Sequence, residues 1–375
     1  MLIDQTTRTR SWLSLKVITL PIIFLFLYSC SPYAVRPTSA ERLILENGMK
    51  NKGPEYSQPR LVSGKLILTL SNVETFTDST LTLDQNNPNI PGDEKPYLGI
   101  WSADIRDYPT QQVLPGSMVS PDSYTLFEDS DYGNIIHHWN VLDQIGELDS
   151  FKISRTFRYL TYDYRPVPTP DQERQQWATI PDSILQKYTR PERFLEQDEA
   201  LIDTVFMLLE NVADPVSQAR VLYDFVQSTL TYVYPPEERG VRNAFKTRAG
   251  DCGQYSALFI SMARIAGIPA RQQSGFNFYS GRTGAHVWSE IYLPIKGWVP
   301  VDATREDGFL HLDNRRLITS IGLNIPLEQS PEWATFSNSE VDSGRTDFMQ
   351  MYTLVKRGVK ANFSSQRIIV RSVEL

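Results

Sequence analysis

The chain has 375 residues, with 37 Lys and Arg against 44 Asp and Glu, so its formal net charge is −7. An acidic balance without a basic stripe argues against nucleic acid as a partner, and a supply of only four histidines argues against a metal cofactor. The hydrophobic fraction of 41% is normal for globular proteins, and the length predicts about two domains, each able to bury a core.

The N-terminus has the features of an export signal. Three basic residues precede an apolar run from Val17 to Leu27, which at 11 residues is shorter than the about 18 to 20 needed to span a membrane. The sequence Leu27-Tyr28-Ser29-Cys30 then resembles a bacterial lipobox. We predict that residues 1–29 are a lipoprotein signal peptide and that Cys30 becomes the lipidated N-terminus, which anchors the protein in the bacterial cell envelope, facing the periplasm or the cell surface. An uncleaved membrane anchor is the alternative.

The next two segments differ in their hydrophobic pattern. Residues 30–60 are polar with scattered Pro and Gly, and we interpret them as a tether in which residues 41–46 can form a short helix. Residues 61–165 contain short alternating runs, the clearest being Leu66–Leu70, Leu81–Leu83 and Phe151–Tyr159, separated by turn clusters such as residues 86–89. Short strands with this spacing predict a β-rich domain of the β-sandwich kind.

Two adjacent histidines in this domain, His137 and His138, have neighbouring positions in an expected strand. Adjacent side chains of a strand point to opposite faces, so we interpret both as structural or surface residues rather than as a pair of metal ligands.

The period changes after the proline-bearing stretch of residues 165–170. Apolar positions from Leu201 to Val212 share one helical face, and Asp214-Pro215 provides an N-cap and first position for a second helix. A third helix is predicted from Cys252 to Ile265, ended by Gly267. Strands are predicted at 270–278, 285–293 and 298–302. Helices followed by strands indicate an α+β arrangement.

Cys252 is the chain's only cysteine besides Cys30, so lipidation of Cys30 would leave it without a disulfide partner. Its position at a helix N-terminus favours the thiolate, because unpaired backbone N–H groups and the helix dipole stabilise negative charge there. His286 and Asp302 follow in the order of a base and an orienting acid. His311 is a possible rival base that lacks such neighbouring motifs.

The hairpin that carries His286 and Asp302 must satisfy a register condition. A turn centred on Pro294 places His286 opposite Asp302, whereas a turn centred between Ile295 and Lys296 places it opposite Arg305. We therefore predict an early turn or a compensating bulge.

Four sequence blocks in this region resemble the core of the transglutaminase-like superfamily: Gly250-Asp251-Cys252-Gly253-Gln254-Tyr255, Ala263-Arg264-Ile265-Ala266-Gly267-Ile268-Pro269, Ala285-His286-Val287-Trp288, and Gly297-Trp298-Val299-Pro300-Val301-Asp302. The resemblance covers roughly residues 195 to 325, within a core that we delimit as 175–325. It implies a papain-like α+β fold with Cys252, His286 and Asp302 as the catalytic triad. Asp251, Gly253, Trp288 and Trp298 are candidates for lining the cleft, and residues 326–375 are expected to pack on the core as an extension.

The resemblance implies a thiol enzyme that acts on peptide or protein amides without a cofactor, and the predicted lipidation of Cys30 would anchor this enzyme in the cell envelope. Attack by Cys252 would give an acyl-enzyme, which passes its acyl group either to water, as in a cysteine peptidase or amidase, or to an amine, as in a cross-linking transglutaminase. We favour hydrolysis because water is the default acceptor. A non-catalytic lipoprotein that uses the cleft for recognition is the competing class. The oligomeric state is not indicated by the sequence.

Overall fold

The computed structural model describes residues 36–75, 96–145, 150–279, 282–331 and 344–375. The expected signal peptide, Cys30, the run at Leu81–Leu83 and the turn cluster at 86–89 lie outside the described residues. The described residues all belong to one compact unit. Within the described ranges, no helix is both long enough and apolar enough to cross a membrane.

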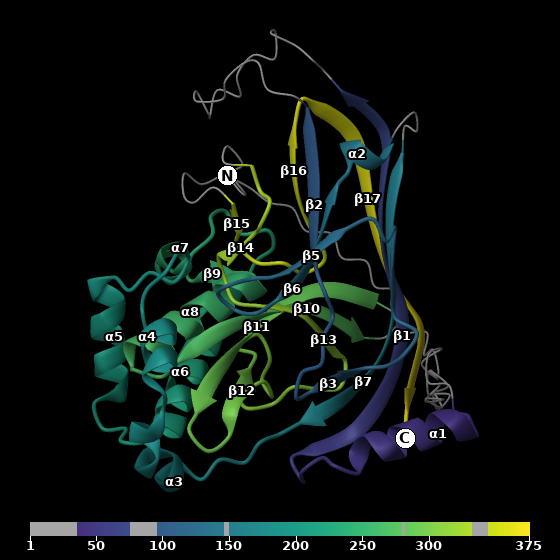
Figure 1. Ribbon diagram of the computed structural model, residues 1–375. Helices are drawn as coiled ribbons and strands as arrows, with labels where there is room; N and C mark the ends of the chain where they lie inside the picture. The colour runs from purple at the N-terminus through teal and green to yellow at the C-terminus, as the bar shows by residue number, and fades with distance from the viewer. Residues whose placement is uncertain (1–35, 76–95, 146–149, 280–281, 332–343) are drawn as a thin grey trace, which may run out of the picture. The chain divides into compact units, whose positions relative to one another are not determined.

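Two antiparallel sheets form the β-rich part (Figure 1). The first sheet has the order β17-β1-β7-β3, with β4 also paired to β7; the strands are β1 (Tyr56–Thr75), β3 (Gln111–Val113), β4 (Met118–Ser120), β7 (Phe151–Tyr164) and β17 (Val359–Glu374). The second sheet has the order β16-β2-β6-β5, comprising β2 (Tyr97–Ala103), β5 (Thr125–Glu128), β6 (Ile135–Asn140) and β16 (Thr353–Arg357). A short helix, α2 (Leu142–Ile145), follows β6.

The two sheets share a hydrophobic core, as the alternating pattern predicts. Leu68 and Leu70 of β1 and Ile153 of β7 pack in one cluster with Ile100 of β2 and Trp139 of β6. Alternate residues are buried in β1 from Gly64 to Leu70 and in β7 from Phe151 to Phe157, whereas β2 and β6 are buried along nearly their whole length. The predicted β-sandwich-like region is therefore confirmed.

The C-terminal segment differs in part from its expected position. We expected residues 326–375 to pack on the catalytic core, but β17 pairs along almost the whole of β1 and β16 pairs with β2. The expectation is therefore met only in part. Backbone hydrogen bonds make both strands edges of the sandwich sheets, while β17 also contacts the core strand Arg282–Leu293 and Phe348 packs on the apolar cluster of the core. The sandwich is thus built from both ends of the described chain.

The segment interpreted as a tether is also partly folded. Helix α1 (Ser39–Met49) begins with a capping box between Thr38 and Glu41, and Arg371 of β17 pairs with Glu41 at 2.5 Å. Leu45 is fully buried against Leu61 and other apolar residues of the sandwich. Residues 39–49 therefore belong to the sandwich, and the helix expected at 41–46 is confirmed.

The α+β part follows β7 and begins with short helices. These are α3 (Pro170–Gln175), a 3₁₀ turn at Trp177–Thr179 and α4 (Asp182–Tyr188). The longer helices are α5 (Glu199–Leu209), α6 (Pro215–Thr229), α7 (Val241–Thr247) and α8 (Cys252–Ile265), and the short strands β8 (Thr231–Tyr232) and β9 (Ala249–Gly250) pair in parallel. The predicted starts of α6 and α8 are confirmed, with Asp214 and Asp251 as their caps.

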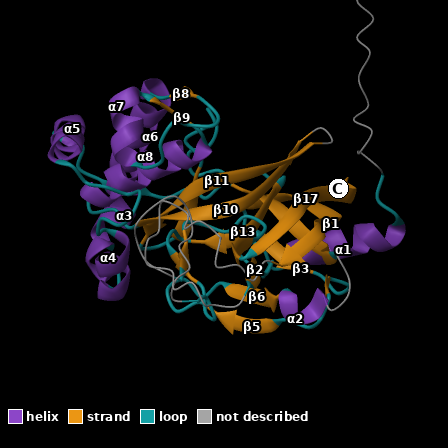
Figure 2. Cartoon of the chain, turned by 90° about the horizontal axis from the view of Figure 1, so that it is seen from above, coloured by secondary structure: helices purple, strands orange, loops and turns teal. Residues whose placement is uncertain are grey.

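A four-stranded antiparallel sheet lies against α8 and has the order β12-β11-β10-β13. Its strands are β10 (Ala270–Tyr279), β11 (Arg282–Leu293), β12 (Gly297–Val301) and β13 (Arg316–Ile321), and a small pair, β14 (Ile325–Pro326) with β15 (Arg345–Thr346), follows. In the view of Figure 2, α5 to α8 gather on the side away from the sandwich strands. The predicted α+β class is confirmed.

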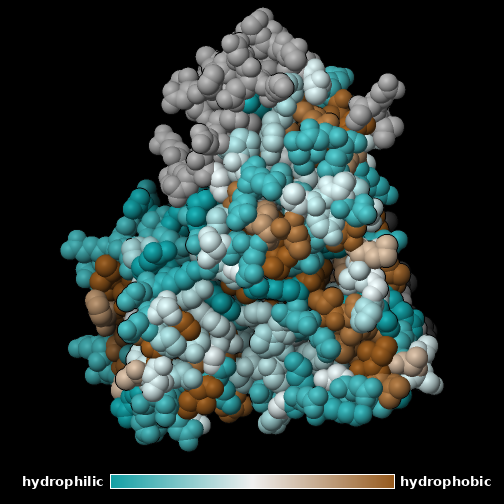
Figure 3. All heavy atoms as spheres, viewed as in Figure 1, coloured by the Kyte–Doolittle hydropathy of each residue, from teal (hydrophilic) through white to brown (hydrophobic). Residues whose placement is uncertain are grey.

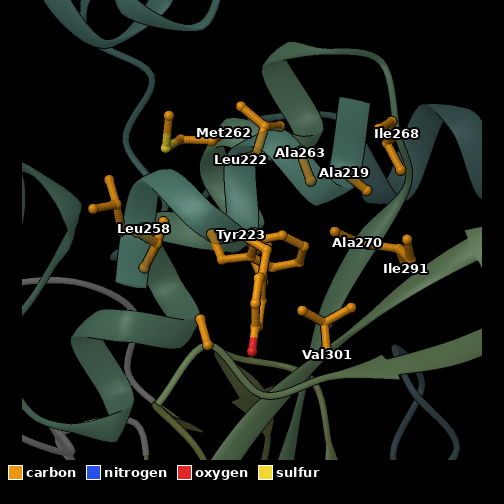
Figure 4. Packing of buried hydrophobic residues seen from close by; sticks show 14 of the residues in the cluster. Ala219, Leu222, Tyr223, Leu258, Met262, Ala263, Ile268, Ala270, Ile291 and Val301 are labelled. Carbon is orange, nitrogen blue, oxygen red and sulfur yellow. The ribbon is translucent and has the colours of Figure 1, made fainter. Parts of the chain in front are cut away.

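The helices bury one continuous apolar cluster against this sheet. Figure 4 shows Tyr223 of α6 between Leu258 of α8 and Val301 of β12. Helix α5 packs on the outer side of this cluster; it buries Leu201 and Val205 and leaves Phe206 and Met207 exposed. The exposed side of α5 contributes brown patches at the edge of Figure 3. A second cluster joins the sheet to the sandwich, with Phe276, Phe278 and Leu317 on one side and Val62, Phe157 and Tyr159 on the other.

Candidate active site

Cys252 occupies the first position of α8, where the helix N-terminus meets the sheet. The Asp251 side chain caps this helix by accepting hydrogen bonds from the backbone N–H groups of Gly253 (2.9 Å) and Gln254 (3.4 Å). Cys252 is half-buried and its thiol is free. The remainder of α8 is almost entirely buried, so the helix holds its first residue on a rigid support.

Asp251 is a cap rather than a cleft-lining residue. It is 2% exposed, and Arg239 Nη1 lies 2.8 and 2.7 Å from its two carboxylate oxygens. A Cβ at Gly253 would lie 2.9 Å from that guanidinium nitrogen, so a side chain there would displace Arg239. The ion pair with Arg239 therefore holds the Asp251 carboxylate in its capping position.

His286 lies on β11 and forms the link between the thiol and the acid. Its Nε2 is 2.9 Å from Asp302 Oδ2, and its ring also hydrogen-bonds the Cys252 side chain, which leaves Nδ1 for the sulfur. Burial alone would lower the pKa of His286, but the charge of Asp302 and these hydrogen bonds outweigh it, so the pKa is raised above its usual value.

Asp302 is buried and fully hydrogen-bonded. Its Oδ1 accepts from the Thr304 backbone N–H (3.1 Å) and hydroxyl (2.6 Å), while Oδ2 faces His286. Burial would raise the pKa of Asp302, but the neighbouring positive charges of His286 and Arg316 hold it well below the usual range. The carboxylate is therefore ionised at neutral pH and fixed in direction.

The hairpin reaches this arrangement by a route that the sequence did not predict. The pairs Ser289–Val301 and Leu293–Gly297 centre the turn on Ile295, so neither the early turn nor a bulge within β12 is present. Instead the strand ends at Val301 and the chain turns away, with the Asp302 N–H donating to the Gly308 carbonyl at 2.8 Å. The side chain of Asp302 therefore approaches His286 from beyond the last strand pair.

This turn is held from the helical side. Tyr223 of α6 directs its hydroxyl toward the segment after Val301 (Figure 4), where it accepts from the Gly308 N–H at 3.1 Å and donates to the Arg305 carbonyl. Gly308 is required at this point, because a Cβ there would lie 2.1 Å from the Asp302 carbonyl oxygen.

Arg316 belongs to the site but was not singled out from the sequence. Its Nη2 donates to Asp302 Oδ2 at 2.8 Å, so one carboxylate oxygen serves both Arg316 and His286. The side chain is 3% exposed. The available signal was a charged residue at the start of a run that is otherwise apolar or small, Leu317 to Ile321.

The two tryptophans proposed as cleft lining have other positions. Trp288 is fully buried and stacks beside His286, with ring centroids 5.9 Å apart, so it is a support for the imidazole and cannot touch a substrate. Trp298 packs against Tyr188, Tyr292 and the guanidinium of Arg271. The cleft-lining expectation is therefore wrong for Trp288.

The remaining histidines are engaged elsewhere. His311, the possible rival base, is 5% exposed, with Nε2 3.1 Å from Asp163 Oδ2 and Nδ1 2.9 Å from the Asp307 carbonyl oxygen. His137 pairs with Arg155, and His138 stacks on Trp101, so both are buried structural residues. Among the residues that the structure describes, no cluster of three His, Cys, Asp or Glu side chains could hold a metal ion.

Residues 203–303 match the family model of the transglutaminase-like superfamily. The crystal structure of a candidate cysteine protease from Cytophaga hutchinsonii shares the fold, with a TM-score of 0.52 over 82% of this chain and 91% of that chain at 15% identity.

Two curated relatives also match parts of the sequence. The uncharacterized protein YebA of Bacillus subtilis is 23% identical over 202 residues, which are 50% of this chain and 25% of the relative. A protein-glutamine gamma-glutamyltransferase of Pseudomonas aeruginosa is 30% identical over 100 residues, which are 23% of this chain and 15% of the relative. The chain thus spans a quarter or less of the length of these relatives.

Proposed function

Because residues 203–303 form a transglutaminase-like domain, we propose that this protein is a thiol enzyme that cleaves or transfers amide acyl groups. Cys252 is the nucleophile, His286 transfers protons and Asp302 orients His286. The observation that carries the proposal is the bonding of the imidazole, which is joined through Nε2 to Asp302 and hydrogen-bonded to Cys252. A thiol needs a base within hydrogen-bond reach, and the base needs a partner on its second nitrogen.

The proposed reaction proceeds in two steps. The Cys252 sulfur attacks the amide carbonyl carbon after its proton passes to His286, and the resulting imidazolium gives that proton to the departing amine. A water molecule, deprotonated by His286, then attacks the thioester, releases a free carboxylate and restores the thiol. Asp302 remains ionised throughout, because its role is to orient the ring and stabilise its positive charge.

The backbone around Cys252 offers a donor for the oxyanion. Asp251 occupies the N–H groups of Gly253 and Gln254, and the Cys252 N–H donates a hydrogen bond to the hydroxyl of Tyr232. Strand β8 holds Tyr232 beside Gly250 through its pairing with β9. We assign the Cys252 N–H as one donor to the developing oxyanion, which would replace the Tyr232 hydroxyl as its acceptor.

We favour hydrolysis of a peptide or protein over amine transfer. A transglutaminase must position an amine so well that it competes with solvent water, which requires a shaped amine approach. The four motif blocks specify no such approach, and the sequence contains no Asp-x-Asp-x-Asp-Gly calcium loop. Cross-linking is the second candidate, because one relative of 30% identity over 100 residues is a protein-glutamine gamma-glutamyltransferase.

The two reactions can be separated by their products. Purified protein is incubated with glutamine-containing peptides and a labelled primary amine, and free carboxylate and amine adduct are quantified by mass spectrometry. We expect Cys252-dependent carboxylate with little amine adduct and no need for added metal, and Cys252→Ala should give neither product. Efficient adduct formation at millimolar amine would establish the transglutaminase instead. The absence of any Cys252-dependent product across peptide libraries would favour a binding protein.

We also propose that the protein is a lipoprotein of the bacterial cell envelope, on the basis of Leu27-Tyr28-Ser29-Cys30 and the short apolar run before it. The chain contains two cysteines, which gives a matched pair of variants. Metabolic labelling with a fatty-acid analogue should tag the wild type and Cys252→Ala but not Cys30→Ala. Equal labelling of all three proteins would rule out lipidation at Cys30.

A further inference from the structure

Arg316 is a buried cation directly behind the candidate triad. It begins β13, where it pairs with Asn277 of β10, and β10 pairs on its other side with β11, the strand of His286. Strands β10 and β13 approach closely at Gly275 of β10, where a Cβ would lie 1.8 Å from the Leu317 carbonyl oxygen of β13. This strand order places Arg316 next to Asp302, the first residue after the end of β12.

The surroundings hold the guanidinium in one orientation. It lies over the ring of Trp288 at 5.4 Å and near that of Tyr279 at 5.8 Å, and its Nη2 donates to Asp302 at 2.8 Å. Asp313 is 3.6 Å from Nε. The carboxylate of Asp302 has no remaining freedom to rotate, because Thr304 takes Oδ1 while His286 and Arg316 share Oδ2.

A second buried arginine shows how a purely structural guanidinium is used in this fold. Arg264 of α8 donates to the carbonyls of Ala270 (2.9 Å) and Arg190 (2.8 Å) and pairs with Glu192 at 2.7 Å. Arg316 is equally buried, yet its Nε and Nη1 have no hydrogen-bond partner among the described residues. Burying a cation whose donors lack hydrogen bonds is costly, so its ion pairs with Asp302 at 2.8 Å and Asp313 at 3.6 Å offset that cost, and of the two the pair with Asp302 is also a hydrogen bond.

We propose that Arg316 is a positioning residue of the active site: it fixes the direction of Asp302 toward His286 and limits the negative charge that Asp302 presents to the imidazole. The proposal rests on the proposed function of the triad and extends it by a fourth residue. Without Arg316, the imidazolium would hold its proton more strongly and be a poorer acid toward the leaving amine.

The electrostatic effect on His286 has a definite sign. The charged and titratable groups facing the ring are Asp302, Cys252 and Arg316, and those around Arg316 are Asp302, Asp313, Tyr279 and Arg305. Burial lowers the pKa of His286, Asp302 and Cys252 raise it, and Arg316 lowers it. Loss of the cation is therefore expected to raise the pH at which His286 releases its proton.

The test is an NMR titration of the histidine rings in the full chain, which has four histidines; the His286 signal is assigned from its loss in His286→Gln. Two variants separate charge from hydrogen bonding. Arg316→Gln keeps a donor for Asp302 but removes the charge, and we expect the His286 midpoint to move up by on the order of one pH unit. Arg316→Lys keeps the charge, and its midpoint should stay near that of the wild type.

Arg264→Gln is the matched control, because it removes an equally buried cation far along α8 from Cys252. We expect it to lower the melting temperature while leaving the His286 midpoint and turnover unchanged. Arg316→Gln should also lower kcat with little change in KM. An unchanged midpoint in Arg316→Gln, an equal shift in Arg316→Lys, or an equal shift in Arg264→Gln would each overturn the proposal. The titration needs no substrate, so a failure to find turnover would count against the proposed function without affecting this result.

Discussion

In the part of the chain that the structure describes, two buried His–Asp pairs have nearly the same geometry. His286 Nε2 lies 2.9 Å from Asp302, and His311 Nε2 lies 3.1 Å from Asp163. Both histidines are almost inaccessible, at 8% and 5% exposed. Their residue types, separation and burial do not distinguish them, so the distinction must come from what faces the other ring nitrogen.

That second nitrogen differs in kind between the pairs. In His311, Nδ1 lies 2.9 Å from the carbonyl oxygen of Asp307, so both ring nitrogens face oxygen acceptors and neither faces a side chain that could give up a proton to the ring. In His286 the other nitrogen faces the Cys252 thiol, which can donate. Asp163 is on β7 of the sandwich, so the His311 pair joins the two parts of the fold. The comparison teaches that a His–Asp pair becomes a candidate base only through its third partner.

The largest expected difference between the pairs is in turnover. His286→Ala should lower kcat by about 10⁴-fold or more, and Cys252→Ala combined with His286→Ala should be little worse than either alone, because the residues act as a unit. His311→Ala, the matched control, should retain kcat within about threefold, since it lies outside the reacting group. Steady-state kinetics on one peptide substrate compares the wild type with these four variants. If His311→Ala loses activity and His286→Ala keeps it, the base has been assigned wrongly.

The next largest difference is expected between the two aspartates, Asp302 and Asp163, in the effect of their substitution on kcat. Asp302→Asn leaves the imidazole with the wrong partner and should lower kcat by about 10²- to 10⁴-fold while the circular dichroism spectrum is unchanged. Asp163→Asn should leave kcat near the wild-type value. Equal losses of kcat in the two variants would mean that Asp302 acts only through the stability of the fold.

The two histidine variants should rank in the opposite order when the free energy of unfolding is measured instead of kcat. His311→Ala leaves the buried Asp163 without its closest buried partner and should lower the free energy of unfolding by about 1–3 kcal/mol. His286→Ala should cost less, because Asp302 keeps Arg316 and Thr304. Urea unfolding of both variants provides the comparison. A larger loss in His286→Ala would show that the active-site pair is also the main structural link.

The smallest expected effect is the dependence of the unfolding free energy on pH. Because the pKa of His286 is raised in the folded protein, its protonation stabilises the fold fully below about pH 6.5, and this contribution is lost as the pH rises through the folded value. The pKa of Asp302 is lowered, so its contribution is present above about pH 3.9 and is lost only at lower pH.

Unfolding free energies measured from pH 6 upward test this directly. The stability difference between wild type and His286→Gln should shrink as the pH increases. Arg264→Gln, which removes no group titrating in this range, should give a difference that stays flat with pH. A wild-type advantage that grows toward alkaline pH would contradict the assigned direction for His286.

The three triad residues, Cys252, His286 and Asp302, could be predicted from the sequence because each lies in a short local motif. The start of α8 at Cys252 and its end near Gly267 follow from neighbouring residues, and the hairpin strands follow from alternation, whereas the capping role of Asp251 was not predicted. The register was predicted wrongly, because the approach of Asp302 depends on the turn to Gly308 rather than on strand pairing. Arg239 and Arg316 were missed, since their contacts join residues from separate elements.

Contacts between distant parts of the chain were also missed in the prediction of the fold. The alternation of β1 and β7 predicted a sandwich, but nothing local to β16 and β17 indicates that they pair with β2 and β1 near the other end of the described chain. Edge strands are chosen by long-range pairing, which one sequence does not specify. Leu45 similarly gives α1 an apolar contact with the sandwich that a polar, proline-bearing segment did not suggest.

The central claim is that Cys252 forms the acyl-enzyme with His286 as its base. Intact-protein mass spectrometry of a quenched reaction with a peptide substrate measures this most directly. The account predicts an acyl adduct on Cys252 in the wild type and in His311→Ala, a slower build-up in Asp302→Asn, and no adduct in Cys252→Ala. Substrate turnover by Cys252→Ala at the wild-type rate, or an adduct that forms equally fast in His286→Ala, would contradict it.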